Sequence, residues 1–528
     1  MPSVRLLAVS TVLSLAALGA APAAAAETAQ TAETAQTATC TSRVPADANG
    51  DGYAEVAIGS PETFDARGAV NVLYGQPGGL VVDPSGGAPD DLYLTQDTPG
   101  VPGTANKDDR FGSATAFGDF DHDGCADLAI GAPQDSGIGS VTVLFGTPQG
   151  LTTTGAVRLK ATTVTAQLDT RFGATLATGD LNGDGFDDLA VTMTALDVRN
   201  AEDAGGVATF YGSRQGLNRR LAPVVVTEAT KGVPGVARKN DAVGSSLAIG
   251  NVDGKGRNEL IVGSSEDHEF DGSVQVLKTT AHGFARQQPK PVTRRTRGLP
   301  AGLIQRFGDA IAVGDVNGDR IADVAVGAPE ADAQYPSGGW DNGAVITLLG
   351  SSKGLTVKGS TRFSGGVGGV PGDESSSGFG AAVILGRFNA DRYDDLAVGV
   401  PNTTVAGVRG AGAVTVLFGG RGGLTTKGVV SIDASTPGMA GDPEPSDILG
   451  HAVGAARVQG TPQATLLIAA PYRGAGSVAD LHGVVWELPP GADGPQPLAS
   501  RQYTATTPGL HTGPGSEVSD FGSALSTS

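Results

Sequence analysis

Acidic side chains recur at alternate positions in the stretch DFDHDGCADLAIGAP, which begins at Asp119. Asp119, Asp121, Asp123 and Asp127 hold positions 1, 3, 5 and 9 of the loop. Alternate side chains of a tight loop converge on one point, and Ca²⁺ prefers six to eight oxygen ligands. The main-chain carbonyl of Cys125 at position 7 would add one more oxygen. We therefore interpret this stretch as a calcium-binding loop.

The same spacing returns in three further loops, so the sequence predicts four Ca²⁺ ions. The additional ligands are Asp47, Asn49, Asp51, Tyr53 (carbonyl) and Glu55 in the first loop, Asp180, Asn182, Asp184, Phe186 (carbonyl) and Asp188 in the third, and Asp315, Asn317, Asp319, Ile321 (carbonyl) and Asp323 in the fifth. A solvated turn rich in Asp, Asn and Gly would explain a single copy. Four copies of mutually repelling carboxylates favour a cation. Calcium is favoured over magnesium, which keeps several waters, and an EF-hand is excluded because its acid stands at position 12 between helices.

Three related loops carry basic side chains where the others carry acids, and we predict no ion in them. Lys255 stands at position 5 of the fourth loop, while Arg387 and Arg457 stand at position 1 of the sixth and seventh loops. The predicted ions are therefore confined to the first, second, third and fifth loops.

Each acidic loop belongs to a repeat that begins with an FG element. The glycine of that element falls at Gly112, Gly173, Gly244, Gly308, Gly380, Gly450 and Gly522, in steps of 61 to 72 residues. Each repeat has four β-prone runs, one before the acidic loop, one directly after it (LAIGAP), a third (SVTVLFG) and a fourth that follows a GL pair. Repeats of four antiparallel strands predict an all-β fold, a seven-bladed β-propeller. A solenoid is the competing repeat fold, but it needs capped ends.

The two ends of the chain support a closed ring. Residues 520–528 (DFGSALSTS) form an FG element without its acidic loop, and the first repeat starts at an acidic loop without an FG element. We expect these two halves to make one blade, so that blade 1 of a single propeller over residues 40–528 is completed by 520–528.

The first residues have the layout of a secretory signal peptide. Arg5 precedes an apolar run that is too short to span a bilayer, and small residues follow up to Ala26. We expect residues 1–26 to be removed by cleavage near Ala26, residues 27–39 to be a disordered leader, and the protein to be secreted. In an oxidising compartment Cys40 and Cys125 are expected to form a disulfide, with two buried free thiols as the alternative. A net charge of −19 argues against a nucleic-acid partner, and no later segment is long enough to span a membrane.

The paired motifs resemble FG-GAP repeats. Phe111-Gly112 is followed by Gly131-Ala132-Pro133, and Phe307-Gly308 by Gly327-Ala328-Pro329, with an acidic loop between each pair. Such repeats build the propeller of integrin α-subunit heads and many secreted bacterial proteins. The resemblance covers nearly all of 40–528, and departs from the pattern where blade 3 has VTMT in place of GAP. It implies that the calcium loops join strands 1 and 2 on one face, and that ligands bind the opposite face, made by the 2–3 and 4–1 loops.

The function predicted from these features is binding without catalysis. The 2–3 loop over residues 330–343 holds Tyr335 and Trp340, which we rank first as contacts for an extracellular protein or carbohydrate; a tryptophan packed in its own loop is the alternative. Motifs of serine hydrolases, zinc proteases and P-loop enzymes are absent. We expect a monomeric calcium-stabilised adhesion module. A secreted hydrolase or lyase for a polysaccharide or phospholipid, with its site in the central channel or on the ligand face, is the alternative.

Overall fold

Short antiparallel strands make up nearly all the regular structure in the part of the chain that the computed structural model describes. That part comprises residues 40, 44–82, 90–217, 221–300, 302, 304–331, 342–372, 378–474, 482–511 and 520–526. Helical structure there is limited to single turns, namely α1 (Thr63–Ala66), α2 (Asp267–Phe270), η1 (Asp135–Gly137), η2 (Ala161–Thr163) and η3 (Pro497–Ala499). The predicted signal peptide and leader, together with Tyr335 and Trp340, lie outside the described residues.

Seven four-stranded antiparallel sheets form the seven predicted blades. From the inner to the outer strand, blades 1 to 4 consist of β30 (Ala524–Leu525), β1 (Val56–Ser60), β2 (Ala69–Leu73) and β3 (Leu92–Leu94); β4 (Ala114–Gly118), β5 (Asp127–Ala132), β6 (Ser140–Phe145) and β7 (Thr152–Lys160); β8 (Phe172–Gly179), β9 (Asp188–Met193), β10 (Val207–Phe210) and β11 (Val224–Val226); β12 (Ser246–Gly250), β13 (Glu259–Ser264), β14 (Ser273–Leu277) and β17 (Val292–Thr293). Blades 5 to 7 consist of β18 (Ile311–Gly314), β19 (Asp323–Ala328), β20 (Ala344–Leu349) and β21 (Thr356–Phe363); β22 (Ala382–Gly386), β23 (Asp395–Val400), β24 (Ala413–Phe418) and β25 (Thr425–Ile432); β26 (Ala452–Ala456), β27 (Thr465–Ala470), β28 (Val484–Leu488) and β29 (Arg501–Tyr503). Blade 4 also carries a small hairpin of β15 (Thr279–Thr280) and β16 (Gly283–Phe284).

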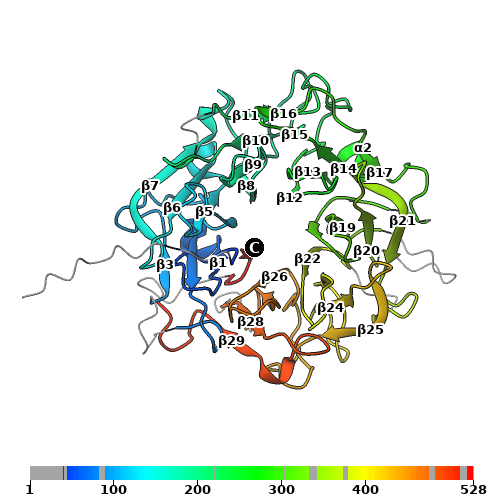
Figure 1. Ribbon diagram of the computed structural model, residues 1–528. Coiled ribbons are helices and arrows are strands. Elements are labelled where there is room, and N and C mark those ends of the chain that lie inside the picture. Colours follow the sequence, from blue (N-terminus) through cyan, green and yellow to red (C-terminus); the bar gives the residue numbers. More distant parts are fainter. Residues whose placement is uncertain are drawn as a thin grey trace, which may run out of the picture. The chain divides into compact units, whose positions relative to one another are not determined.

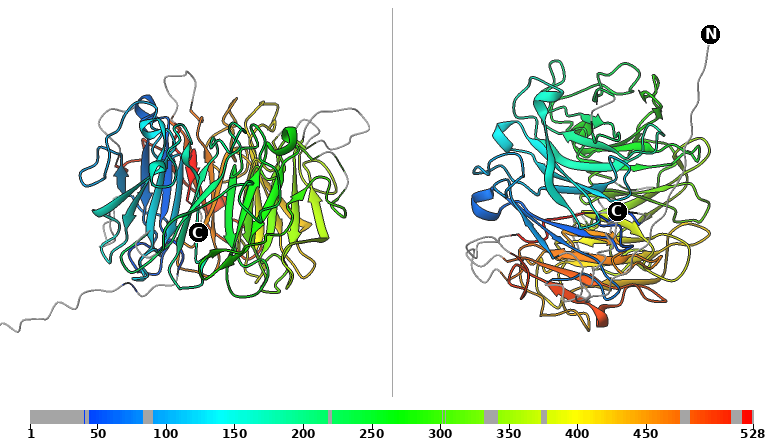
Figure 2. Two further views of the ribbon diagram at one scale, coloured as in Figure 1. Left: turned by 90° about the horizontal axis from the view of Figure 1, so that it is seen from above. Right: turned by 60° about the vertical axis from the view of Figure 1, so that its left-hand side comes forward.

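The inner strands contact one another in chain order and close a cycle. β4 contacts β8, and the series continues through β12, β18, β22 and β26 to β30, which contacts β4 again. Figure 1 shows this cycle with the inner strands towards the centre. Because neighbouring strands of a blade are antiparallel, the 1–2 and 3–4 connections lie at one end of the blades and the 2–3 and 4–1 connections at the other. The side view in Figure 2 shows the strands running between two sets of loops. We call these ends the acidic-loop face and the opposite face.

The C-terminal FG element closes the ring, as predicted. β30 pairs antiparallel with β1, with Leu525 opposite Ile58 and Ala524 opposite Gly59. Ser526 extends this pairing, because its N–H donates to the carbonyl of Ala57 at 3.0 Å and its hydroxyl accepts the Ala57 N–H at 2.9 Å. Blade 1 therefore takes its inner strand from one end of the propeller sequence and its other three strands from the opposite end.

The FG and GAP elements recur because they approach each other closely between neighbouring blades. The main chain of the FG phenylalanine bridges to a glycine at the start of the third strand of the preceding blade, as Phe172 does with Gly139. A Cβ placed on the GAP glycine Gly131 would lie 2.1 Å from the carbonyl oxygen of Gly173, the FG glycine of the next blade. Glycine at the GAP position permits this close approach in most blades, whereas blades 3 and 7 carry Thr192 and Ala469 at the equivalent position.

Burial along each blade explains its composition. Every position is buried in the second strands β5, β9, β13, β19, β23 and β27. Both faces of these strands therefore need apolar or small residues, and their sequences are continuous apolar runs such as LAIGA. The outer strands β7, β21 and β25 alternate between partly buried and exposed positions. The apolar cores lie between neighbouring blades, where the FG phenylalanines are fully buried.

Candidate metal centres

The predicted calcium loops all lie on the acidic-loop face, directly before the second strand of their blade. In blade 2 the loop leads from β4 into β5, so position 9 (Asp127) is the first residue of β5. In blade 1 the loop leads into β1, whose inner neighbour β30 comes from the other end of the propeller sequence. The fold thus places the loops of blades 1, 2, 3 and 5 at equivalent points of the ring.

Acids at positions 1 and 9 shape each loop by accepting main-chain hydrogen bonds. In blade 2, Asp119 accepts the N–H groups of Asp123 and Gly124, both at 3.1 Å. Asp127 accepts those of Phe120 at 3.0 Å and Gly146 at 2.9 Å, and so ties the loop to the end of the third strand. The same position 9 bonds occur at Asp188, Asp323 and Asp395. Position 9 therefore has a structural role in blade 6 as well, where we predict no ion.

Blades 1 and 2 bring three acidic side chains within metal-binding reach of one another. One oxygen from each of Asp47, Asp51 and Glu55, and likewise from Asp119, Asp121 and Asp127, lies within 4.8 Å of the other two. No third group of this kind occurs among the described residues of the other calcium-type loops.

The chemistry of these two clusters fits a cation. Burial, followed by repulsion from Asp47 and Asp51, raises the pKa of Glu55 well above its usual value. Its carboxylate is buried, accepts the main-chain N–H of Ala48 and interacts with that of Gly75. In blade 2, burial and then the charges of Asp123 and Asp119 raise the pKa of Asp121 to about 6. A divalent cation would remove the repulsion within each cluster.

Blades 3 and 5 have the same loop conformation with an asparagine at position 3. Asn182 donates to Asp184 at 3.2 Å, and Asn317 donates to Asp323 at 3.4 Å. Position 6 is Arg320 in blade 5, which adopts a φ of +68°, whereas the glycine of blade 2 at this position has a φ of +91°. The arginine thus tolerates the left-handed turn that glycine makes freely.

Basic side chains occupy the loops in which no ion is predicted. In blade 4, the ammonium groups of Lys255 and Lys278 lie 2.8 and 3.2 Å from Oδ2 of Asp253. In blade 6, Arg387 donates to the carbonyl of Arg392 at 3.1 Å. In blade 7, Arg457 donates to the carbonyl of Thr461 at 2.8 Å. Protein cations therefore lie among the loop oxygens where the other blades present acids.

A disulfide joins Cys125 of the second loop to Cys40, with their Cα atoms 5.2 Å apart. Cys40 lies between two of the acidic loops. A Cβ on Gly50 would lie 2.7 Å from the Cα of Cys40, and a Cβ on Gly124 would lie 2.5 Å from its carbonyl oxygen. The segment at Cys40 is thus packed against the loops of both blade 1 and blade 2. An open hollow beside it is lined in part by Asp119, Asp123 and Asp187.

The opposite face carries most of the exposed large apolar side chains of the described residues. Leu168, Val236 and Val367 lie in 4–1 connections, and Phe270 and Tyr472 lie in 2–3 connections. Buried ion pairs stiffen the same face. Arg158 pairs with Asp135, and Arg473 pairs with Asp447 while its guanidinium lies 5.5 Å from the ring centre of Trp486.

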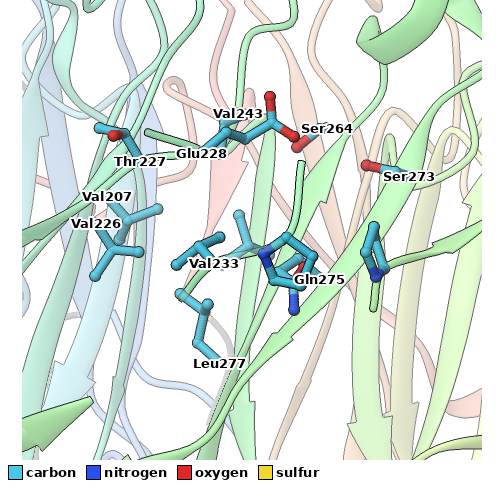
Figure 3. A pocket seen from close by; sticks show the side chains of 13 residues that line it. Val207, Val226, Thr227, Glu228, Val233, Val243, Ser264, Ser273, Gln275 and Leu277 are labelled. Atoms are coloured by element: carbon cyan, nitrogen blue, oxygen red, sulfur yellow. The ribbon is translucent and has the colours of Figure 1, made fainter. Parts of the chain in front are cut away.

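A narrow apolar pocket lies on the same side of the ring between blades 3 and 4 (Figure 3). Val207, Val226, Val233 and Leu277 line it, and the carboxyl group of Glu228 lies at one end near Ser264. Burial, followed by the charge of Asp267 and then that of Asp241, raises the pKa of Glu228 to about 8. The sequence analysis did not find this pocket, because its lining comes from two blades.

The structure also brings together a polar group that the sequence analysis missed. Asp90, Asp91 and His511 each offer a ligand atom within 4.8 Å of the others. His511 and Asp91 are 420 positions apart, and no local spacing in the sequence indicates their contact. The ring closure is what brings them side by side.

Comparisons with known proteins agree with the repeats and the fold. A family model described as FG-GAP repeat matches residues 111–144, 172–210 and 307–348. Phosphatidylinositol-glycan-specific phospholipase D from Bos taurus is 28% identical over 312 residues, which cover 54% of this chain and 34% of that protein. Integrin alpha pat-2 from Caenorhabditis briggsae is 30% identical over 266 residues, which cover 48% of this chain and 20% of that protein. The chain thus spans about a third or less of the length of these relatives.

Solved structures resemble the chain only distantly. The Dos1 propeller aligns with a TM-score of 0.37 and 12% identity, covering 72% of this chain and 66% of that one. The exotype rhamnogalacturonan lyase YesX aligns with the same TM-score and identity, covering 78% and 68%. Similarity at this level carries no argument about function. Among the described residues, no helix is long and apolar enough to cross a membrane.

Proposed function

We propose, from the premise that this chain is an FG-GAP repeat protein with an integrin α-like seven-bladed propeller, that it is a secreted, calcium-stabilised binding module. The observation that carries the proposal is the convergence of three acids in each of blades 1 and 2, where burial and repulsion raise the pKa of Glu55 and of Asp121. Calcium supplies the charge that these oxygens require, and holds the loop against the start of the second strand. Four ions, in blades 1, 2, 3 and 5, would act by binding the folded state only, which raises stability by mass action.

The ligand face of this module is the opposite face. Leu168, Val236, Phe270, Val367 and Tyr472 supply exposed apolar surface there. Apolar and aromatic anchors in a rigid setting are typical of protein and glycan contacts. The loop with Tyr335 and Trp340 belongs to the same set of connections and is proposed as part of this face. The calcium ions lie at the other end of the blades, so they would support the ligand face through the fold rather than by touching the ligand.

Binding without catalysis is the favoured role because the acidic clusters repeat from blade to blade. A catalytic acid–base pair is needed once, whereas the same carboxylates recur in four loops. Phosphatidylinositol-glycan-specific phospholipase D shares only a third of its length with this chain. A secreted hydrolase or lyase is therefore kept as the alternative outcome of the test.

Two measurements on the full secreted chain test the proposal. A glycan and extracellular-matrix protein array should show a ligand whose binding falls at least tenfold in the triple variant Val236→Ser, Phe270→Ser, Tyr472→Ser. Val430→Ser is the control, since Val430 is an exposed apolar residue within the outer strand β25 and belongs to none of the 2–3 or 4–1 connections. A turnover screen on polysaccharides and phospholipids runs beside it. Reproducible turnover that an opposite-face variant abolishes would replace binding with the enzyme alternative.

A further inference from the structure

A polar cluster outside the calcium loops lies where the connection from blade 7 reaches the outer part of blade 1. Asp90 and Asp91 directly precede β3, the outer strand of blade 1, and His511 lies in the connection that follows β29. The cluster combines an imidazole with two carboxylates, which is a different donor set from the all-oxygen loops. Imidazole nitrogen suits Zn²⁺, Cu²⁺ and Ni²⁺, whereas Ca²⁺ takes oxygen ligands.

Two buried side chains hold His511 in one orientation. Asp91, whose side chain is fully buried, accepts the main-chain N–H of His511 at 2.8 Å and lies 2.9 Å from its Nδ1. Asn71 in β2 is 1% exposed and donates from Nδ2 to the main-chain carbonyl of His511 at 2.8 Å. When Asp91 accepts the Nδ1–H, a neutral ring presents Nε2 as an acceptor, and a protonated ring presents a second N–H towards Asp90. The ring is therefore held by its backbone and by Nδ1, and Nε2 faces Asp90.

The free nitrogen faces a second carboxylate at a distance that suits an intervening ion. Nε2 of His511 lies 3.8 Å from Oδ2 of Asp90, which is too long for a hydrogen bond. A zinc ion bound at about 2.0–2.2 Å to one nitrogen and one oxygen would hold them roughly 3.4 Å apart in a tetrahedral site. The side chains of His511 and Asp90 are 56% and 54% exposed, so small adjustments and an entry path are both available.

An unsatisfied atom lies beside the same histidine. Oδ1 of Asn71 is buried and accepts no hydrogen bond from any described residue, although Nδ2 of the same amide is bonded to His511. A buried amide oxygen without a partner is costly unless water or an ion supplies the missing interaction. Asn71 thus adds a second polar group near the main chain of His511, with one atom that water or an ion could satisfy.

We propose that Nε2 of His511 and the carboxylate of Asp90 bind a divalent transition-metal ion of the Zn²⁺ class, with Asp91 as the positioning residue that orients the imidazole. A carboxylate that accepts the second N–H of a metal-binding histidine fixes its tautomer and raises its basicity. Water occupies the remaining coordination positions. The site joins blade 7 to blade 1 at the ring closure, and it does not depend on the calcium loops or on the proposed ligand.

Calorimetric titration of ZnCl₂ into the full chain, kept saturated with Ca²⁺, tests the site. We expect one Zn²⁺ to bind, and binding to be lost in His511→Ala and Asp90→Asn. Asp91→Asn keeps both ligands but loses the orienting acceptor, so its affinity should fall 10- to 100-fold. Asp121→Asn in a calcium loop should bind Zn²⁺ as the unmodified chain does. X-ray absorption of the loaded protein should show a nitrogen or oxygen shell at about 2.0–2.1 Å with imidazole scattering.

Three outcomes would overturn the proposal. The first is an unmodified chain that takes up no Zn²⁺, and the second is a folded His511→Ala variant with unchanged affinity. The third is loss of Zn²⁺ binding in Asp121→Asn, which would place the ion in a calcium loop. Far-ultraviolet circular dichroism of each variant separates loss of the site from loss of the fold, and His511→Asn offers a smaller polar replacement if His511→Ala does not fold.

Discussion

A Cβ atom on Gly131 would lie 2.1 Å from the carbonyl oxygen of Gly173, across the boundary between blades 2 and 3. The same approach occurs between Gly59 and Gly112, between Gly263 and Gly308, between Gly327 and Gly380, and between Gly399 and Gly450, at 2.0 to 2.1 Å. Inner and second strands of successive blades therefore pack main chain against main chain at this level of the ring. This contact is a steric reason for the GAP glycine, whereas the FG glycine Gly173 has a φ of +94° and a Cβ on it would lie 2.8 Å from the carbonyl oxygen of Ser140.

Gly131→Ala is therefore expected to destabilise the propeller by about 1–3 kcal/mol, since a backbone must move to admit the methyl group. Thermal unfolding should show a lower midpoint. Gly422→Ala is the control, because a Cβ there meets no atom within 4 Å, and it should stay within about 0.5 kcal/mol of the unmodified chain. Equal midpoints for the two variants would contradict the steric explanation.

Removal of calcium with EDTA is expected to lower the unfolding midpoint, and calcium at 100 times its Kd should restore about 2.7 kcal/mol per site. Asp121→Asn removes a carboxylate from the blade 2 cluster and should reduce the number of bound ions by one. Asp391→Asn is the matched control, because it lies at position 5 of the blade 6 loop, where Arg387 already supplies a positive charge. Isothermal titration with Ca²⁺ counts the ions. An unchanged count in Asp121→Asn, or a reduced one in Asp391→Asn, would contradict the assignment.

Reduction of the Cys40–Cys125 bond is expected to weaken calcium binding at the second loop as well as stability. The bond holds the chain at Cys40 against Gly50 and Gly124, and so packs both loops from one side. The paired variant Cys40→Ser, Cys125→Ser should lose about 2–5 kcal/mol, the usual effect of removing a native disulfide. Calcium titration of this variant should show weakened sites in blades 1 and 2 only. Uniform weakening of all sites would indicate a general loss of stability instead.

Asp520 is expected to make the ring closure sensitive to pH. Burial, and more weakly the charge of Glu62, raise the pKa of Asp520 to about 7, even though Ser523 and the N–H of Glu62 donate to it. A carboxyl whose folded pKa lies above its unfolded value of about 3.8 stabilises the fold fully below pH 3.8, and this contribution is lost as the pH rises through 7. In excess Ca²⁺, the unfolding midpoint of the unmodified chain should fall between about pH 4 and 7 more steeply than that of Asp520→Asn. Parallel curves for the two proteins would exclude the effect.

The repeats, the seven blades and the shared closure blade could be predicted because they follow from local spacing. The GAP runs are apolar throughout because second strands are buried on both faces, and this can be read in sequence. Blade 4 shows where the pattern fails. Its outer strand, Val292–Thr293, has only two residues and follows an extra hairpin. This strand could not be predicted, because the long connection before it contains no regular spacing that indicates where pairing resumes.

The candidate sites, too, could be predicted from the sequence only in part. Carboxylates at positions 1, 3, 5 and 9 could be identified from their alternation, but the backbone bonds of Asp127 to Phe120 and Gly146 could not. The contact of His511 with Asp91 depends on how the last 4–1 connection meets blade 1. Such contacts are set by the geometry of the closed ring, and no interval along the chain encodes them.

The basic side chains in blades 4, 6 and 7 divide the ring into unequal arcs. Blades 1, 2 and 3 are neighbours that carry proposed calcium sites, whereas Lys255, Arg387 and Arg457 place a positive charge in the loops of blades 4, 6 and 7. With ions in the proposed sites, a fall in calcium concentration would act on three neighbouring blades of the seven and on blade 5. These blades include blade 1, in which β30 pairs with β1. The calcium concentration around the protein would therefore affect the stability of the ring closure.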